Sequence, residues 1–116
     1  MNMMTREMIE MAVRVDGEMW TVERDLLEND YEFAGTELPR CEALGLGAED
    51  VVIINGDYAV NLDEFHALED ALQEADVLAE LEDGYRLVEC CGERFVFGYD
   101  CGYFTLYVAK TLVSAE

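Results

Sequence analysis

The sequence predicts a single α+β domain in which a small antiparallel sheet is covered by one main amphipathic, acidic helix. Three observations predict this class. Apolar residues recur at helical spacing in the middle of the chain, alternating apolar runs flank a turn near the N-terminus, and aromatic and β-branched segments fill the C-terminal third. Because 116 residues are too few to bury two separate cores, we expect one domain over residues 1–116.

The N-terminal third predicts a hairpin followed by short helices. Residues 8–22 alternate between apolar and polar types on both sides of Asp16-Gly17, a dipeptide that readily adopts positive φ, so they predict a β-hairpin. Residues 24–31 are expected to form a helical turn. A loop over residues 35–39, which contains a proline, is expected to precede a short helix over residues 40–44.

The middle of the chain predicts a buried strand and the main helix. The apolar run 51–54 predicts the strand, the Asn-Gly-Asp sequence at 55–57 predicts a turn, and residues 58–60 predict a returning strand. Asn61 is the expected N-cap of a helix that ends near Asp83-Gly84, where glycine can take the left-handed conformation. The apolar stripe of this helix comprises Leu62, Phe65, Leu68, Leu72, Ala75 and Ala79.

The C-terminal third predicts a meander of three antiparallel strands. Residues 85–90, 94–99 and 104–108 are rich in aromatic and β-branched side chains, and turn-forming residues with glycine separate them. Together with the N-terminal hairpin, these strands would form the sheet on which the main helix packs.

The charge of the chain restricts its partners. Twenty-seven Asp and Glu against seven Lys and Arg leave a net charge of −20, which excludes direct binding to nucleic acid and to anionic membranes. Partners selected by charge should be basic. Duplex DNA as long as this domain carries about the same total charge. If the protein's charge were spread evenly over its surface, however, the charge density would be lower than that of DNA. Imitation of DNA therefore needs carboxylates clustered on one face, or a homodimer.

Targeting and redox signals are weak. No stretch approaches the length of apolar sequence that spans a membrane, and the first residues do not resemble a signal peptide, so we expect a cytoplasmic protein that makes no membrane contact. Two of the four cysteines, Cys90 and Cys91, are adjacent, and free thiols are expected.

Patterns for catalysis and for metal binding are absent from the sequence. His66 lies near Glu69 on the main helix and could share a metal with it, but the cysteines lack the paired spacing of zinc sites, and an isolated helical histidine is more often a packed or surface residue. There is no EF-hand, catalytic triad or phosphate-binding glycine loop. We therefore expect no enzyme activity, no cofactor and no metal.

Acidic side chains concentrate on the main helix, where Asp63, Asp70 and Glu74 should face away from the apolar stripe. An ordinary solvated helix face is the alternative. A second acidic cluster, which comprises Glu23, Asp25, Glu28, Asp30 and Glu32, favours a binding role. The candidate partner-binding residues are Asp57, Tyr58, Asp63, Glu64, Asp70, Glu74, Asp76, Glu80, Glu82 and Asp83.

Aromatic side chains are a further candidate for partner binding. Aromatic residues are enriched at binding hot spots, so rings that lie exposed beside carboxylates could anchor a partner. On strands such residues are more often part of the core. The candidates are Trp20, Tyr58, Tyr99, Tyr103 and Tyr107.

A short motif carries a resemblance to a known family. Asp57-Tyr58, followed by the acidic, leucine-bearing helix from Leu62 to Leu72, resembles the antirestriction proteins of the ArdA type over residues 50–82. The resemblance implies an acidic dimer that imitates bent duplex DNA and occupies the DNA-binding groove of type I restriction enzymes. The chain departs from that family in its shorter length, its N-terminal hairpin and its cysteine-rich meander, which leave the target open.

Two functions follow from these observations. The first is an inhibitor that imitates nucleic acid and occupies the basic DNA- or RNA-binding site of a host-defence enzyme, either a restriction enzyme or a CRISPR effector. The second is a protein-protein interaction module that uses an exposed aromatic sheet, with the acidic residues serving solubility.

Overall fold

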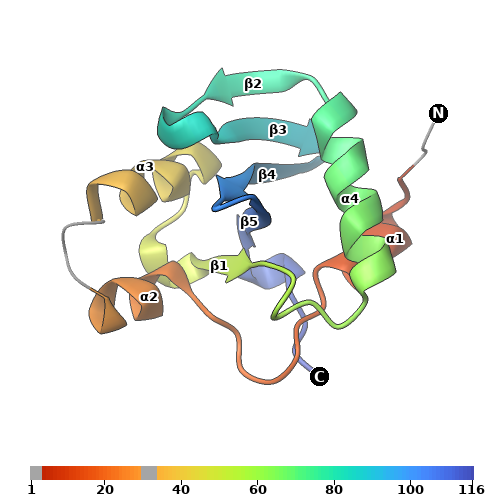
Figure 1. Ribbon diagram of the computed structural model, residues 1–116, viewed down its shortest axis with the longest axis horizontal. Coiled ribbons are helices and arrows are strands. Elements are labelled where there is room, and N and C mark those ends of the chain that lie inside the picture. The colour runs from red at the N-terminus through yellow and green to blue at the C-terminus, as the bar shows by residue number, and fades with distance from the viewer. Residues whose placement is uncertain (1–3, 30–33) are drawn as a thin grey trace.

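A computed structural model describes residues 4–29 and 34–116 of the chain. It contains a five-stranded sheet and four α-helices, so the predicted α+β class is confirmed (Figure 1). In chain order the elements are α1 (Arg6–Ala12), α2 (Val22–Glu28), α3 (Ala34–Leu44), β1 (Val51–Ile54), α4 (Leu62–Glu74), β2 (Val77–Glu80), β3 (Arg86–Cys90), β4 (Glu93–Asp100) and β5 (Tyr103–Ala109).

The sheet is antiparallel throughout, with the strand order β1-β5-β4-β3-β2. The predicted meander is confirmed as β3, β4 and β5. Two-residue turns connect these strands, at Cys91-Gly92 and at Cys101-Gly102, and all four turn residues have positive φ. Such turns match the right-handed twist of the strands that they join, which explains why glycine occupies the second position of each.

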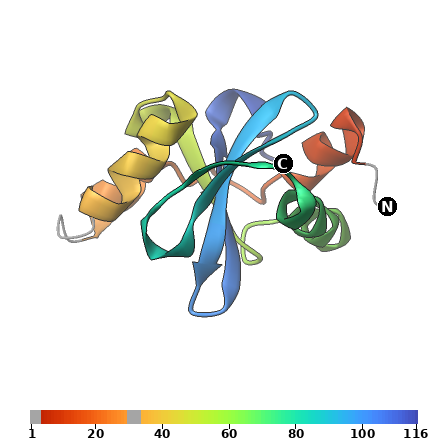
Figure 2. The same cartoon turned by 90° about the horizontal axis from the view of Figure 1, so that it is seen from above.

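Helices cover both faces of the sheet, so the molecule has three layers. α1 and α4 pack on one face, and α2 and α3 pack on the other (Figure 2). Between the sheet and α1 and α4 lies a core that includes Ile9, Val52, Ile54, Phe65, Leu68, Phe95 and Leu106. Between the sheet and α2 and α3 lies a core that includes Val22, Cys41, Val51, Ile53, Tyr85, Val96 and Tyr107.

The predicted N-terminal hairpin over residues 8–22 was wrong. Residues 6–12 form α1, where Ile9, Ala12 and the following Val13 are fully buried at helical spacing. The hydroxyl of Thr5 caps this helix by accepting a hydrogen bond of 3.2 Å from the backbone N–H of Met8. The spacing of apolar residues in this segment fits both a strand and a helix. The helix places Ile9, Ala12 and Val13 against α4 and the sheet.

The predicted loop over residues 35–39 was also wrong, because those residues belong to α3. Pro39 lies inside the helix, four residues after Gly35. The C-terminal end is where the sequence placed it: Gly45 adopts a φ of 76°, and the N–H groups of Gly45 and Leu46 bond the carbonyls of Glu42 and Cys41. α2 ends at Glu28, so the last residues of the predicted turn lie outside the described residues.

The main helix is present but shorter than predicted. α4 ends at Glu74, and residues 77–80 form β2, which pairs with β3. The prediction that the helix continues to Asp83-Gly84 was therefore wrong. Asn61 is the N-cap residue, as predicted, but its side chain forms no capping hydrogen bond, because its amide donates to the carbonyl of Met11. Residues 58–60 form no strand beyond an isolated bridge from Ala59 to Val15. Residues 77–80 form a strand because β3 leaves an edge of the sheet open for pairing and because this segment begins with apolar residues, one of them β-branched.

Candidate functional site

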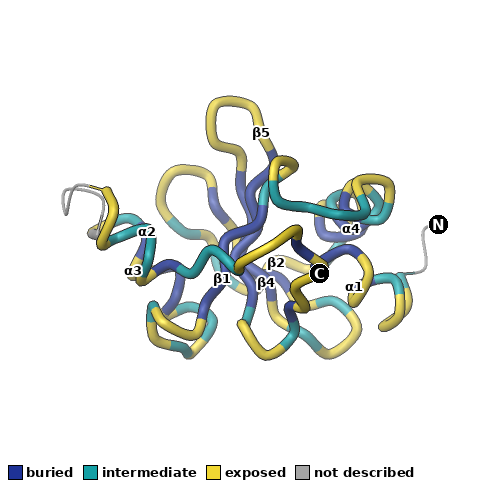
Figure 3. Tube along the Cα trace, turned by 90° about the horizontal axis from the view of Figure 1, so that it is seen from below, coloured by how far each residue is buried: buried dark blue, intermediate teal, exposed yellow. Residues whose placement is uncertain are grey.

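The exposed face of α4 carries the carboxylates that the sequence singled out. Asp63, Asp70 and Glu74 are exposed, whereas Phe65, Leu68 and Leu72 of the predicted apolar stripe are buried against the sheet. The two ends of that stripe differ from the prediction, because Leu62 is 48% exposed and Ala79 lies on β2. Buried, half-buried and exposed positions alternate along this helix (Figure 3). Glu64 is half-buried on the same helix. The predicted orientation of the acidic face is confirmed.

Basic side chains form almost no ion pairs with this face. Each of the six arginines forms an ion pair, but their partners are Glu10, Glu18, Glu28, Asp83, Glu80, Glu89, Glu93 and Glu116. Within residues 4–29 and 34–116, the only ion pair on α4 joins His66 to Glu69 at 3.2 Å, and it carries charge only when the histidine is protonated. The carboxylates of α4 are therefore not neutralised by basic side chains.

The structure divides the predicted partner-binding residues. Asp76 is exposed just beyond the end of α4, but Glu80 and Asp83 lie beyond it, on β2 and in the turn after it, where Arg86 and Arg40 pair with them at 3.7 Å. Glu82 is exposed in the same turn. The prediction that Glu80, Glu82 and Asp83 belong to the main helix was wrong, because the chain turns into β2 after α4 ends at Glu74.

Asp57 and Tyr58 are neighbours in sequence but line different hollows. Asp57 is exposed beside the start of α4, where it lines a hollow of about 610 Å³ together with Leu62, His66 and Tyr103. Tyr58 is half-buried and lines a smaller, adjoining cavity, which shares Asn55, Asp100 and Thr105 with this hollow. Asp57 thus lies in the hollow beside α4, and Tyr58 lies in the neighbouring cavity.

Aromatic rings from the β4–β5 hairpin lie beside the α4 carboxylates. The Tyr99 hydroxyl donates a hydrogen bond of 2.7 Å to Glu69 and also contacts Gln73. Partial burial, together with the Glu69 carboxylate, raises the pKa of Tyr99 to about 12. Tyr103, at the tip of the hairpin, is 74% exposed. Of the five predicted aromatic candidates, these two therefore lie exposed beside carboxylates, whereas Tyr107 is buried.

Sequence reasoning missed a second candidate site, on the opposite face of the sheet. It is a cavity of about 240 Å³ between α2, α3 and the sheet. Its lining residues come from segments that are distant in sequence, and they include Trp20, Asp25, Glu37, Arg40, Tyr58, Tyr85, Asp100 and Tyr107. We call it the Glu37 cavity.

A polar network crosses the wall of the Glu37 cavity. The Arg40 guanidinium donates to the Tyr107 hydroxyl at 2.7 Å, and that hydroxyl donates to Oε1 of Glu37 at 3.2 Å. The same guanidinium lies 3.5 Å from the ring centroid of Tyr85 and 3.7 Å from a carboxylate oxygen of Asp83. The Arg40 guanidinium thus contacts Tyr107, Tyr85 and Asp83. It forms no ion pair with Glu37, which lies one helical turn earlier on α3.

Glu37 is a buried acid with an incomplete set of partners. Its side chain faces the sheet, the residue is 8% exposed, and its Oε2 atom is buried without a hydrogen-bond donor among the described residues. Burial, followed by the nearby Asp25 carboxylate, raises the pKa of Glu37 to about 7. Because Asp25 is also an acceptor, the two groups can bond each other only while Glu37 retains its proton.

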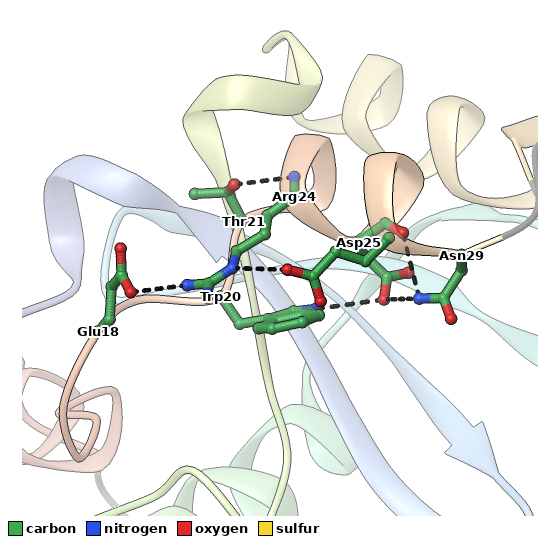
Figure 4. Close-up of polar contacts among 7 residues, drawn as sticks. Glu18, Trp20, Thr21, Arg24, Asp25 and Asn29 are labelled. Atoms are coloured by element: carbon green, nitrogen blue, oxygen red, sulfur yellow. Dashed lines mark hydrogen bonds and ion pairs between the residues drawn. The ribbon is translucent and has the colours of Figure 1, made fainter.

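Asp25 is fixed in place by its neighbours (Figure 4). The indole N–H of Trp20 donates to its Oδ1 atom at 3.2 Å, and the amide of Asn29 donates to the same atom at 2.6 Å. Arg24, on the same helix, forms ion pairs with Glu18 and Glu28, and the Arg24 guanidinium lies 4.7 Å from the Trp20 ring centroid (Figure 4). Asp25, one member of the second predicted acidic cluster, therefore points inward and is not part of a docking face. Glu23 and Glu28 of that cluster are exposed, and Asp30 and Glu32 lie outside the described residues.

The sequence did not predict this site because its charged residues have the pattern of solvated surface positions. Glu37 and Arg40 are charged, and they lie within the expected loop and at the start of the expected short helix, which is typical of solvated positions. The available signal was their spacing: Glu37, Arg40, Cys41 and Leu44 lie at i, i+3, i+4 and i+7, which is one face of a helix.

Metal ligands and thiols offer no further site. In the described part of the chain, no three His, Cys, Asp or Glu side chains gather as a metal site requires. The four cysteines are free thiols, of which Cys41 is buried and Cys91 and Cys101 are exposed. No helix of the described residues combines the length and apolar character needed to cross a bilayer.

Comparison of the chain with known protein families, with curated proteins and with solved structures gave no significant match. The resemblance of residues 50–82 to ArdA-type antirestriction proteins therefore stays a prediction.

Proposed function

We propose that this protein is a non-enzymatic acidic decoy, which imitates the charge of nucleic acid and occupies the basic nucleic-acid-binding site of another protein. The observation that carries the proposal is the α4 face, where Asp63, Glu64, Asp70 and Glu74 lie without an arginine or lysine partner in the described part of the chain. Such a surface attracts a basic groove and repels nucleic acid.

The spacing of charge on α4 supports imitation of one nucleic-acid strand. Its 13 residues extend over about 20 Å at about 1.5 Å each. One strand of duplex DNA carries about six phosphates over that length. α4 presents four carboxylates without a cationic partner, and Asp76 follows just beyond its end. The charge density of this face therefore approaches that of a strand, although the average over the whole surface does not.

The exposed rings beside α4 suit the same kind of partner. Arginine is abundant in basic nucleic-acid-binding grooves, and its guanidinium stacks on aromatic faces while it pairs with carboxylates. Tyr103, which is largely exposed, offers such a face near Asp57 and His66. The resemblance to ArdA-type proteins favours a host-defence enzyme, either a restriction enzyme or a CRISPR effector, as the partner.

A displacement experiment tests the proposal. Fluorescent target DNA is bound to a type I restriction enzyme and, separately, to an RNA-loaded Cas9, and the protein is titrated while anisotropy is measured. The protein should release DNA from at least one of them, with an affinity that falls by at least about tenfold from low to physiological salt, because exposed charges are screened.

Two matched charge reversals locate the binding face. The triple variant Asp63→Lys, Asp70→Lys and Glu74→Lys should abolish displacement. The control variant Glu7→Lys, Glu23→Lys and Glu42→Lys changes the net charge by the same amount at exposed positions on α1, α2 and α3, and it should retain most of the activity. Equal loss in both variants, or displacement that is insensitive to salt, contradicts the proposal.

A second candidate function is an interaction module that binds through the β4–β5 hairpin, with the acidity serving solubility. The exposure of Tyr103 favours it. Tyr103→Ala would then abolish partner binding while the α4 reversal would leave it nearly unchanged, which is the opposite of the pattern expected for a decoy.

A further inference from the structure

We propose that the Glu37 cavity is a binding site for a small organic cation that carries a guanidinium or alkylammonium group. This site lies between α2, α3 and the sheet, whereas the acidic face of α4 lies on the other side of the sheet. The inference therefore does not rest on the proposed decoy function.

One carboxylate oxygen in the wall of the cavity lacks a hydrogen-bond donor, which a bound ligand could supply. Glu37 is more than nine-tenths buried and lines the cavity. While it is protonated it can bond Asp25, but once it is ionised its Oε2 atom has no donor among the described residues. Buried carboxylate oxygens are nearly always hydrogen-bonded, because loss of hydration is otherwise uncompensated. A cationic donor placed in the cavity would complete the partners of this oxygen.

The protein's own cation does not fill this role. Arg40 is one turn from Glu37, but its guanidinium is held by the Tyr107 hydroxyl, the Tyr85 ring and Asp83. The Tyr85 ring in turn is held close against β4, since a Cβ atom at Gly98 would lie only 2.6 to 2.8 Å from it. These contacts join Arg40 to Oε1 of Glu37 only through the Tyr107 hydroxyl, and although the Arg40 charge favours the ionised carboxylate, Oε2 is left for another cation.

Charge and ring chemistry specify the ligand class. Three carboxylates, of Asp25, Glu37 and Asp100, line the cavity against the single guanidinium of Arg40. Trp20 and Tyr58, whose rings stack with centroids 6.3 Å apart, line it as well. Carboxylates beside aromatic faces bind ammonium and guanidinium groups through charge-assisted hydrogen bonds and cation–π contacts. Because Asp100 is exposed and Trp20 and Tyr58 are half-buried, the cavity reaches solvent.

Binding of a cation should be linked to a proton. Glu37 faces Asp25 from α2, Arg40 from its own helix and Tyr107 from β5, and with these neighbours its pKa is raised to about 7. A bound cation favours the ionised form, so Glu37 should release its proton on binding. At pH 7 the release should be about half a proton for each ligand, since half of the molecules carry it.

The experiment uses n-butylguanidinium as the probe and n-butylurea, its neutral counterpart of similar shape, as the ligand control. Isothermal titration calorimetry at pH 8 should detect butylguanidinium and not butylurea. Affinity should fall by about 30-fold at pH 5.5, where few molecules have ionised Glu37. Titrations at pH 7 in two buffers of different ionisation enthalpy measure the released proton.

Glu37→Gln keeps the shape of the side chain and removes its charge, and it should weaken binding at pH 8 by at least about tenfold. Glu42→Gln makes the same change at an exposed position of α3 and should leave binding unchanged, which separates the site from general attraction to an acidic protein. Thermal unfolding confirms that both variants fold.

A capped Gly-Arg-Gly peptide distinguishes two sources of the cation. Binding of this peptide at least as tight as that of butylguanidinium indicates an arginine side chain of a partner, and binding of butylguanidinium alone indicates a free metabolite. Equal binding of butylurea, no binding of butylguanidinium at pH 8, or no proton release at pH 7 would overturn the proposal. Failure of these titrations leaves the α4 experiment unaffected, so the two proposals fail independently.

Discussion

The guanidinium of Arg40 and the hydroxyl of Tyr107, 67 residues apart in the sequence, meet in a buried hydrogen bond of 2.7 Å. This bond joins α3 to β5, and the Tyr107 hydroxyl donates a hydrogen bond of 3.2 Å to Oε1 of Glu37. A polar chain of this kind stabilises the protein only while every member has a partner. The consequences can be measured at each of its members.

Glu37→Gln should stabilise the protein at pH 8 and have little effect below pH 4.5. The pKa of Glu37 is raised from an ordinary value of 4.5 to about 7. Between these values the unfolded chain gives up the proton that the folded protein keeps, so ionisation of Glu37 destabilises the fold as pH rises. The gain should reach about 3 kcal/mol at most above pH 7.

Urea unfolding of wild type and Glu37→Gln at pH 4.5, 6 and 8 checks this expectation. The difference in unfolding free energy should grow through the interval between pH 4.5 and pH 7, while Glu42→Gln shows no such trend. A difference that does not vary with pH would mean that the Glu37 carboxyl ionises normally in the folded protein.

Tyr107→Phe should destabilise the protein by about 1 to 3 kcal/mol, because it removes the hydroxyl that satisfies both Glu37 and Arg40. Tyr103→Phe removes the hydroxyl of a largely exposed tyrosine and should change stability by less than about 0.5 kcal/mol. Chemical denaturation at pH 8 gives both values. A neutral effect of Tyr107→Phe would show that the network contributes nothing to the fold.

Gly98→Ala should destabilise the protein by about 1 to 3 kcal/mol. A Cβ atom at this position would meet the ring of Tyr85 at 2.6 to 2.8 Å, so the ring must move away from β4 and disturb the Arg40 contact. Gly35→Ala is the matched control, since nothing lies within 4 Å of a Cβ atom there and alanine favours a helix. Thermal melting should move in opposite directions for the two variants.

Thiol labelling at pH 8 should modify Cys91 and Cys101 quickly and Cys41 only after unfolding. The first two lie exposed in the hairpin turns. Cys41 is buried on α3, and burial, followed by the Glu37 charge, raises its pKa to about 11, so little reactive thiolate is present. Mass spectrometry of the labelled peptides identifies the modified residues, and fast labelling of Cys41 would show that α3 opens readily.

The sequence by itself determined those parts of the protein that depend on local chemistry. The meander follows from β-branched and aromatic runs separated by residues that tolerate positive φ, and the core of α4 follows from the spacing of Phe65, Leu68 and Leu72. The acidic face of α4 follows from the same periodicity, because a helix that buries one stripe must expose the opposite one.

Only the tertiary structure decided where ambiguous segments belong. Met8 to Val13 fits both a strand and a helix, and packing against α4 selected the helix. Residues 77–80 became β2 because β3 offered an edge for pairing, which removed Glu80, Glu82 and Asp83 from the helix face. The Glu37 cavity arises from the same cause. Its residues come from α2, α3, four strands or their ends, and two loops, and no local pattern records which distant side chains a fold brings together.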